Sequence, residues 1–157
     1  MKALFLTNEY PPYIYGGAGV HVDYLSRELA KTMPIEVRCF GDQKLVKGNL
    51  SVTGFELDAS GFNCPKGLES VLGAVRRCTD FNTTNIDADL VHCHTWYSHF
   101  GGILAKLNSG LPLVITVHSL EPLRPWKRDQ PSGGDDSTVW LERTALEPAC
   151  AVTLVAP

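Results

Sequence analysis

Three glycines stand close together near the start of the chain, in the segment Tyr15-Gly-Gly-Ala-Gly-Val20. Glycine lets the backbone approach a ligand closely, and the free N–H groups at the start of a helix attract anions. The segment therefore predicts a loop that binds a phosphate. It is not the dinucleotide pattern Gly-x-Gly-x-x-Gly, because the glycines fall at positions 16, 17 and 19 and no later acidic residue is placed for a ribose. A tight turn that binds nothing is the structural alternative.

Two histidines, His92 and His94, are separated by one residue at the end of an apolar run. Residues two apart on a strand face the same side, so their imidazoles should lie together, with His99 near. A zinc site would need a third and a fourth ligand at the usual spacing, and these are missing, so we expect no metal. Ligands of α/β proteins bind at the carboxyl ends of parallel strands, which favours contact with a substrate. Hydrogen-bonded histidines at a strand end are the structural alternative.

A further histidine, His118, directly follows the strongly β-branched run Leu113–Val117. It should therefore stand at the same sheet edge as the other two, beside the glycine loop if the strands before them are neighbours. In the segment after it, Trp126 offers a flat surface for a sugar ring, and Arg124 and Lys127 offer cations for a phosphate. A rigid surface turn stiffened by two prolines is the alternative for this segment.

The cysteines suggest no thiol chemistry. They are five in number and scattered without Cys-x-x-Cys spacing, which indicates reduced, mostly buried thiols of a cytoplasmic protein. Cys93 lies between the two histidines, but no sequence feature activates it as a nucleophile.

The elements that must position these residues alternate between strands and helices. Alternation of this kind predicts an α/β fold with a Rossmann-like, doubly wound parallel sheet, in which residues 3–7, 89–92 and 113–117 are central, parallel strands. Other strands are expected at 35–40, 50–55 and 151–155, and helices at 18–33, 68–75, 101–107 and 138–146. The polar stretch from residue 127 to 137 is expected to be a loop.

Length and composition set the outer bounds. The 157 residues suit one domain, and 44% hydrophobic with 20% charged residues suits a water-exposed surface around a core. A net charge of −3 argues against a broad nucleic-acid footprint. No apolar run has the ~20 residues of a membrane helix, and the N-terminal run is too short for a signal peptide. We therefore expect no membrane association and a cytoplasmic location.

Taken together, four motifs resemble a known family. In order they are Asn8-Glu-Tyr-Pro-Pro12, Tyr15-Gly-Gly-Ala-Gly-Val-His-Val22, Asp89-Leu-Val-His-Cys-His-Thr-Trp96 and Val117-His-Ser-Leu-Glu-Pro-Leu-Arg-Pro-Trp-Lys127. Their order and spacing over most of residues 1–130 are similar to the N-terminal domain of bacterial glycogen synthases. The likeness is strongest to the actinobacterial-type enzymes that use ADP-glucose to make maltose 1-phosphate or to extend α-1,4-glucan.

The resemblance implies one half of a GT-B fold, in which two Rossmann-like domains enclose the active site of a retaining glycosyltransferase. Residues 1–157 would be the N-terminal, acceptor-side domain, and the C-terminal, donor-binding domain would be absent. The substrates would be a nucleotide sugar, ADP-glucose, and an acceptor that is either a glucan or a sugar phosphate, glucose 1-phosphate. No metal or other cofactor is implied.

The resemblance also implies roles for individual residues. Gly16 and Gly17 would meet the phosphate side of the donor, and His118 would touch the transferred sugar and stabilise its cationic transition state. A related branch of the family carries a sugar-contacting histidine at the position of Tyr97, which leaves the division of labour between His94 and His118 open.

The acceptor side is implied to include His94, Trp96 and Tyr97, together with the cations Arg124 and Lys127 of the last motif. Without the Arg/Lys pair of a C-terminal domain, the charge on the leaving group has little stabilisation, so we expect the chain alone to be inactive. Two alternatives stay open: a glycosyltransferase with another nucleotide sugar and acceptor, and a non-catalytic domain that binds sugar or glucan.

Overall fold

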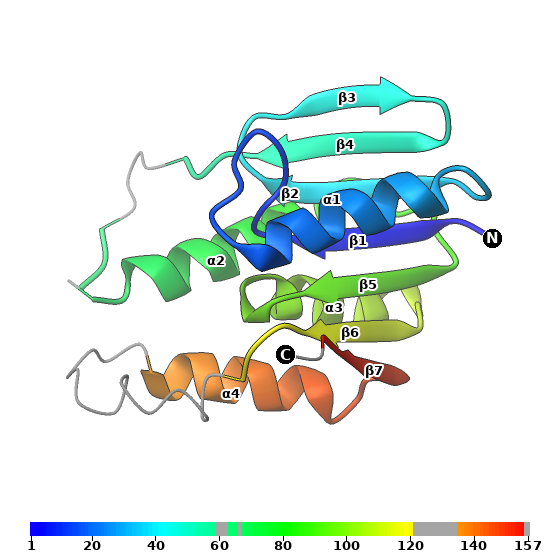
Figure 1. Ribbon diagram of the computed structural model, residues 1–157. Coiled ribbons are helices and arrows are strands. Elements are labelled where there is room, and N and C mark those ends of the chain that lie inside the picture. Colours follow the sequence, from blue (N-terminus) through cyan, green and yellow to red (C-terminus); the bar gives the residue numbers. More distant parts are fainter. Residues whose placement is uncertain (59–62, 66, 121–134, 156–157) are drawn as a thin grey trace.

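The computed structural model describes residues 1–58, 63–65, 67–120 and 135–155. The first apolar run of the chain forms a strand in which every residue is buried. In Figure 1 this strand lies in the middle of the sheet, and helices cover both of its faces. A strand covered on both faces excludes polar side chains, which is why its sequence is a continuous apolar run.

The sheet has seven strands in the order β3-β4-β2-β1-β5-β6-β7. Every pairing is parallel except that between β3 and β4. The predicted parallel alignment of the three central strands is therefore confirmed for β1, β5 and β6. The strands are β1 (Ala3–Thr7), β2 (Ile35–Phe40), β3 (Lys44–Lys47), β4 (Leu50–Phe55), β5 (Leu90–His94), β6 (Leu113–Val117) and β7 (Ala151–Leu154).

Alternate residues of β1 enter two separate hydrophobic cores. Phe5 packs with Val22 of helix α1 (Gly17–Leu29) on one face. Leu4 and Leu6 pack on the other face, where helices α2 (Glu69–Asp80), α3 (Trp96–Ser109) and α4 (Asp135–Leu146) contribute to the core. Helices on both faces confirm the doubly wound architecture. In the described part of the chain, no helix has the length and hydrophobicity needed to cross a lipid bilayer.

Helix α3 begins five residues earlier than its predicted start at Gly101, so that boundary was wrong. The pair Gly101–Gly102 lies inside the helix and allows it to approach the sheet closely. A Cβ added at Gly102 would lie 2.3 Å from the sulfur of Cys93 and 2.8 Å from Cδ1 of Leu113. The glycines therefore serve close packing, and the helix continues through them back to Trp96.

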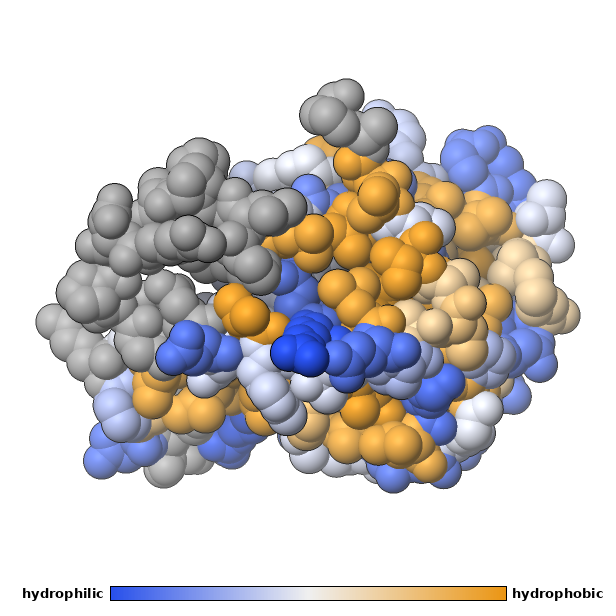
Figure 2. Space-filling model, turned by 90° about the horizontal axis from the view of Figure 1, so that it is seen from below, coloured by the Kyte–Doolittle hydropathy of each residue, from blue (hydrophilic) through white to orange (hydrophobic). Residues whose placement is uncertain are grey.

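The last strand, β7, leaves one edge of the sheet open within the described residues. Figure 2 looks at the molecule from the side on which β7 and α4 lie in Figure 1, and hydrophobic residues cover much of that face. Val152 and Leu154 of β7 and Trp140 of α4 are among the exposed large hydrophobic side chains.

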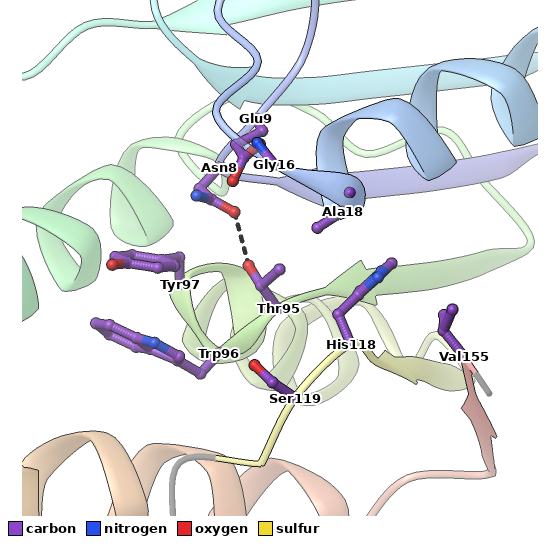
Figure 3. A pocket seen from close by; sticks show the side chains of 11 residues that line it. Asn8, Glu9, Gly16, Ala18, Thr95, Trp96, Tyr97, His118, Ser119 and Val155 are labelled. Carbon is purple, nitrogen blue, oxygen red and sulfur yellow. Dashed lines mark hydrogen bonds between the residues drawn. The ribbon is translucent and has the colours of Figure 1, made fainter. Parts of the chain in front are cut away.

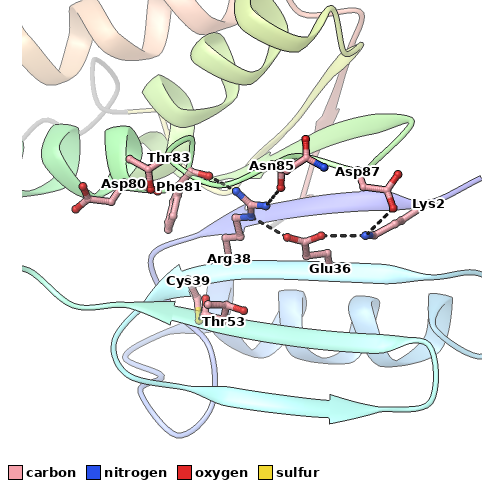
Figure 4. A network of polar contacts seen from close by, with 10 residues as sticks. All are labelled: Lys2, Glu36, Arg38, Cys39, Thr53, Asp80, Phe81, Thr83, Asn85 and Asp87. Atoms are coloured by element: carbon pink, nitrogen blue, oxygen red, sulfur yellow. Dashed lines mark hydrogen bonds and ion pairs between the residues drawn. The ribbon is translucent and has the colours of Figure 1, made fainter.

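A buried cation ties β2 to the segment that follows α2. The Arg38 side chain, 4% exposed, pairs with Glu36 at 2.8 Å. It also donates to the carbonyl oxygens of Phe81 and, at 2.8 Å, Asn85. Figure 4 shows this network and its continuation to Lys2, whose ammonium lies 3.1 Å from the Glu36 carboxylate. These contacts hold the end of α2 against the sheet.

We expect Arg38→Met to lower the free energy of unfolding by about 3 kcal/mol, because it strands buried carbonyl groups and removes one partner of a buried ion pair. The matched control is Arg143→Met, since Arg143 pairs with Glu147 but is 79% exposed. Urea unfolding should show no measurable effect for the control. Equal losses in the two variants would contradict the role assigned to Arg38.

Candidate functional site

The loops that follow β1, β5 and β6 meet at one edge of the sheet and surround a cavity of about 410 Å³. Parallel strands point their carboxyl ends to the same edge, and ligands of α/β proteins collect there. Figure 3 shows the side chains converging from the different loops. This glycine-loop cavity is lined by Asn8, Glu9, Gly16, Gly17, Ala18, Thr95, Trp96, Tyr97, His118, Ser119 and Val155.

The predicted glycine loop forms one wall and leads into α1. Gly16 is the N-cap residue of the helix, and it provides no side-chain hydrogen bond to the first N–H groups of α1. A Cβ added at Gly16 or Gly17 would meet no atom within 4 Å. The space beside these two glycines is therefore open for a ligand, at the end of a helix that attracts anions.

Glu9 and the third glycine hold the loop in shape. The Oε2 atom of Glu9 accepts hydrogen bonds from the backbone N–H groups of Tyr15, at 2.9 Å, and Gly16, at 3.0 Å. A Cβ added at Gly19 would lie 2.8 Å from that same oxygen. Gly19 is thus needed for packing, whereas Gly16 and Gly17 face the cavity.

Four imidazoles gather beneath and beside the cavity. His92 and His94 lie on the same side of β5, as predicted, with ring centroids 4.2 Å apart. Nδ1 of His94 lies 3.4 Å from Nε2 of His118. The ring of His21, on α1, lies 5.1 Å from that of His118 and 5.8 Å from that of His94. His118 lines the cavity, whereas His94 is fully buried and contacts His118 without lining the cavity itself.

Burial lowers the pKa of three of these imidazoles, those of His92, His94 and His118. Loss of solvent lowers the pKa of His92 to about 4 and that of His94 well below its usual value, and neighbouring imidazoles lower both further. Burial and His21 also lower the pKa of His118, although Glu9 opposes them. Nε2 of His94 has no partner among the described residues. A buried lone pair costs less than a buried N–H, which favours a proton on Nδ1 that is donated to His118.

The cluster has a geometry that three metal ligands could share. His21, His94 and His118 each offer one nitrogen, and these atoms lie within 4.8 Å of one another. From the sequence we predicted no further metal ligands beside His94, because the prediction used only the spacing of ligand residues along the chain. Folding brings two such residues, His21 and His118, from distant segments, so the argument from spacing along the chain does not exclude a metal.

Thr95, between β5 and α3, has a backbone conformation that only glycine adopts readily, with φ of 67° and ψ of 155°. Its hydroxyl donates a hydrogen bond of 2.7 Å to Oδ1 of Asn8, which Figure 3 shows across the cavity. The turn that it makes directs Trp96 and Tyr97 to the cavity wall, where their rings stack with centroids 3.9 Å apart. Strain of this kind collects at ligand sites.

A second cavity of about 560 Å³ adjoins the first and shares Asn8, Glu9 and Tyr97 with it. Because Tyr13 and Tyr15 also line it, we name it the tyrosine cavity. Of the predicted site residues, Gly16, Gly17, Trp96, Tyr97 and His118 line the glycine-loop cavity. The predicted cations Arg124 and Lys127 lie outside the described residues.

The sequence missed His21 and Thr95 as site residues. His21 lies inside the motif that follows the glycine loop, and its position four residues after Gly17 puts it in the second turn of α1. This spacing could have predicted that His21 lies near the glycine loop. Nothing in the sequence marks the unusual backbone of Thr95. Cys93 takes no part, because burial raises its pKa far above the usual range and keeps the thiol neutral.

Solved structures of known proteins share this fold. Sucrose-phosphate synthase from Thermosynechococcus elongatus matches with a TM-score of 0.67 at 16% identity, over 97% of this chain and 42% of that one. The catalytic domain of starch synthase IV from Arabidopsis thaliana, bound to ADP and acarbose, matches with a TM-score of 0.57 at 14% identity, over 76% of this chain and 34% of that one. At these identities the likeness shows the fold: an N-terminal α/β domain of the GT-B glycosyltransferase architecture.

The family follows from the sequence comparisons. The sequence model of Glycosyltransferase Family 4 matches residues 15–157, and the chain belongs to this family. It is 39% identical to α-maltose-1-phosphate synthase of Mycolicibacterium smegmatis and 36% identical to that of Mycobacterium tuberculosis, over 99% of this chain in both cases. The chain spans 38% of the length of each of these relatives.

The strain at Thr95 predicts that glycine is more stabilising than alanine at this position, which is the reverse of their order at an ordinary helical position. At an ordinary helical position such as Leu72, alanine should be more stable than glycine by about 1 kcal/mol. At Thr95 both substitutions remove the hydrogen bond to Asn8, but only glycine relieves the strain, so glycine should be more stable than alanine by about 1–2 kcal/mol. Urea unfolding of the four variants measures both differences. The same order at both positions would show that Thr95 is not strained.

The buried histidines predict a loss of stability in acid. Burial lowers the pKa of His92 and His99 from 6.5 to about 4 in the folded chain. Between these values the unfolded chain binds more protons, so the free energy of unfolding should fall as pH is lowered, by about 1.4 kcal/mol per pH unit for each histidine. Unfolding at a series of pH values between 7 and 5 should give a shallower slope for His99→Gln. Asn82→Ala, which keeps every histidine, should lower the whole curve without changing its slope; an unchanged slope in His99→Gln would refute the assignment.

Proposed function

We propose that this chain is the N-terminal, acceptor-side domain of a retaining glycosyltransferase that transfers glucose from ADP-glucose to an α-1,4-glucan or to glucose 1-phosphate. The observation that carries the proposal is the convergence of Gly16, Gly17 and His118 on one cavity at the carboxyl edge of the sheet. The names of the two mycobacterial relatives support the reaction class. Because the chain spans 38% of their length, the donor-binding part would be a C-terminal GT-B domain that faces this edge.

In the proposed reaction, the bond between the anomeric carbon and the nucleoside diphosphate breaks and a bond to an acceptor hydroxyl forms. The hydroxyl proton leaves with the diphosphate. The N–H groups at the start of α1 suit the growing negative charge of the diphosphate, since the open space beside Gly16 and Gly17 admits a phosphate. Electrostatic stabilisation of this kind is usually the largest contribution to catalysis.

His118 suits the positive charge that develops on the sugar. Its lowered pKa keeps the imidazole uncharged at neutral pH, so it does not repel a cationic sugar ring. The hydrogen bond from His94 orients the ring of His118, which assigns His94 to positioning and His118 to contact with the sugar. The proposed chemistry needs no metal, although His21, His94 and His118 could hold one.

The test is a chimera in which this chain replaces the matching segment of the Mycolicibacterium smegmatis relative. With radiolabelled ADP-glucose and an α-glucan or glucose 1-phosphate, the chimera should form labelled product, and the 157-residue chain alone should form none. His118→Ala in the chimera should lower kcat by about 100-fold, the scale for losing one group that stabilises transition-state charge. Arg143→Ala, on the distant surface of α4, is the control and should leave kcat unchanged.

Washing with a chelator should also leave the rate unchanged. A chimera that binds glucan but transfers no sugar, beside an active parent enzyme, would favour the non-catalytic alternative. Transfer by the isolated chain that is lost in His118→Ala would refute the need for a second domain.

A further inference from the structure

Arg77, in the last turn of α2, lines the tyrosine cavity. Its guanidinium lies over the ring of Phe40, 3.8 Å from the ring centroid, and its Nε atom donates to the carbonyl oxygen of Gly73 at 3.2 Å. The site removes part of the solvent that would stabilise the charge, and this burial lowers the pKa of Arg77. The guanidinium is nevertheless always protonated in proteins.

Arg77 differs from the other described arginines because it has no carboxylate partner among the described residues. Arg27 pairs with Asp23, and Arg38 pairs with Glu36. Arg76 and Arg143 likewise pair with Asp58 and Glu147. A half-buried cation without an anion is costly, and planar guanidinium groups bind phosphate through two parallel hydrogen bonds. The unpaired charge therefore points to an anionic ligand in the cavity.

The rest of the tyrosine cavity suits a sugar ring. Carboxylates of Glu9, Asp42 and Glu56 line it and can accept hydrogen bonds from sugar hydroxyls. Two of them are already held in place: Oδ1 of Asp42 accepts from the hydroxyl of Tyr13 at 2.9 Å, and Glu9 accepts from the loop backbone. These carboxylates would repel a multiply charged diphosphate. One guanidinium with several hydroxyl acceptors matches a ligand with many hydroxyls and a single phosphate.

The position of the cavity fits an acceptor. It shares Asn8, Glu9 and Tyr97 with the glycine-loop cavity, so ligands in the two cavities would lie against the same side chains. A sugar phosphate with its phosphate on Arg77 would therefore lie in a cavity that adjoins the one lined by His118. A neutral glucan would leave the guanidinium unpaired.

We propose that the tyrosine cavity binds a hexose phosphate as the acceptor, with its phosphate on Arg77 and its hydroxyls on the carboxylates of Glu9, Asp42 and Glu56. This inference rests on the proposed function and decides between its two acceptors in favour of the sugar phosphate. It assigns acceptor specificity to a residue that lies outside all four sequence motifs.

The test is direct binding to the 157-residue chain, measured by titration calorimetry with glucose 1-phosphate, glucose and inorganic phosphate. Glucose 1-phosphate should bind at least tenfold more tightly than either of the other two, because it alone carries both groups. Arg77→Gln should weaken its binding at least tenfold, and Arg77→Lys, which keeps the charge but loses the fork, should weaken it less. Arg143→Gln removes a paired, exposed arginine and should change nothing.

Amide chemical-shift mapping on the unsubstituted chain makes the test independent of whether the variants fold. Glucose 1-phosphate should perturb the Arg77 Nε signal and the amide of Gly41, which also lines the cavity. Shifts confined to the glycine loop would overturn the inference, as would equal binding of glucose and glucose 1-phosphate or full binding by folded Arg77→Gln. If the inference about the tyrosine cavity fails, the proposed function can still hold, because transfer by the chimera to a neutral glucan does not involve Arg77. Conversely, Arg77-dependent binding without any transfer would contradict only the proposed function.

Discussion

Burial of β1 on both faces is the constraint on which the rest of the structure depends. Because Leu4 and Phe5 point into different cores, the strand can lie only in the middle of the sheet, between β2 and β5. Its register places Thr7 beside His94, and His94 beside Thr116 of β6. The loops after these strands therefore begin at the same level. The glycine-loop cavity exists because these three strands, which are distant in sequence, end together.

The sequence predicts the parts of this fold that repeat a local pattern. Continuous apolar runs identified the central strands because a doubly covered strand tolerates nothing else. Strand β3 was missed, since every residue from Lys44 to Lys47 is exposed and leaves no burial pattern. The glycine loop and His118, which line the glycine-loop cavity, were predicted from their positions directly after expected strands. His21 lies against His118 only in the folded chain. The lack of an ion pair at Arg77 among the described residues is likewise a property of the tertiary structure. Neither feature can be predicted from the local sequence.

Several destabilising features lie at the carboxyl edge of the sheet, whereas stabilising contacts lie elsewhere in the structure. Thr95 has a strained backbone. Within the described residues, Nε2 of His94 lacks a hydrogen-bond partner and the half-buried Arg77 lacks a counter-charge. Arg38, in contrast, is buried between β2 and the segment that follows α2, where it has hydrogen bonds and an ion pair. Unfavourable features of this kind persist only when the surrounding structure enforces them. Their concentration in one region separates the binding surface from the framework that holds it.

The wall that the two cavities share has a thermodynamic consequence. Tyr97 and Glu9 belong to both, so a molecule in one cavity alters the packing and the field met by a molecule in the other. Such ligands are energetically coupled, and the coupling is reciprocal: each changes the affinity for the other by the same factor. Tyr97 stacks on Trp96 at the start of α3, so any shift of its ring is opposed by a helix packed against the sheet. Binding in one cavity is therefore linked to binding in the other through the stacked rings of Trp96 and Tyr97.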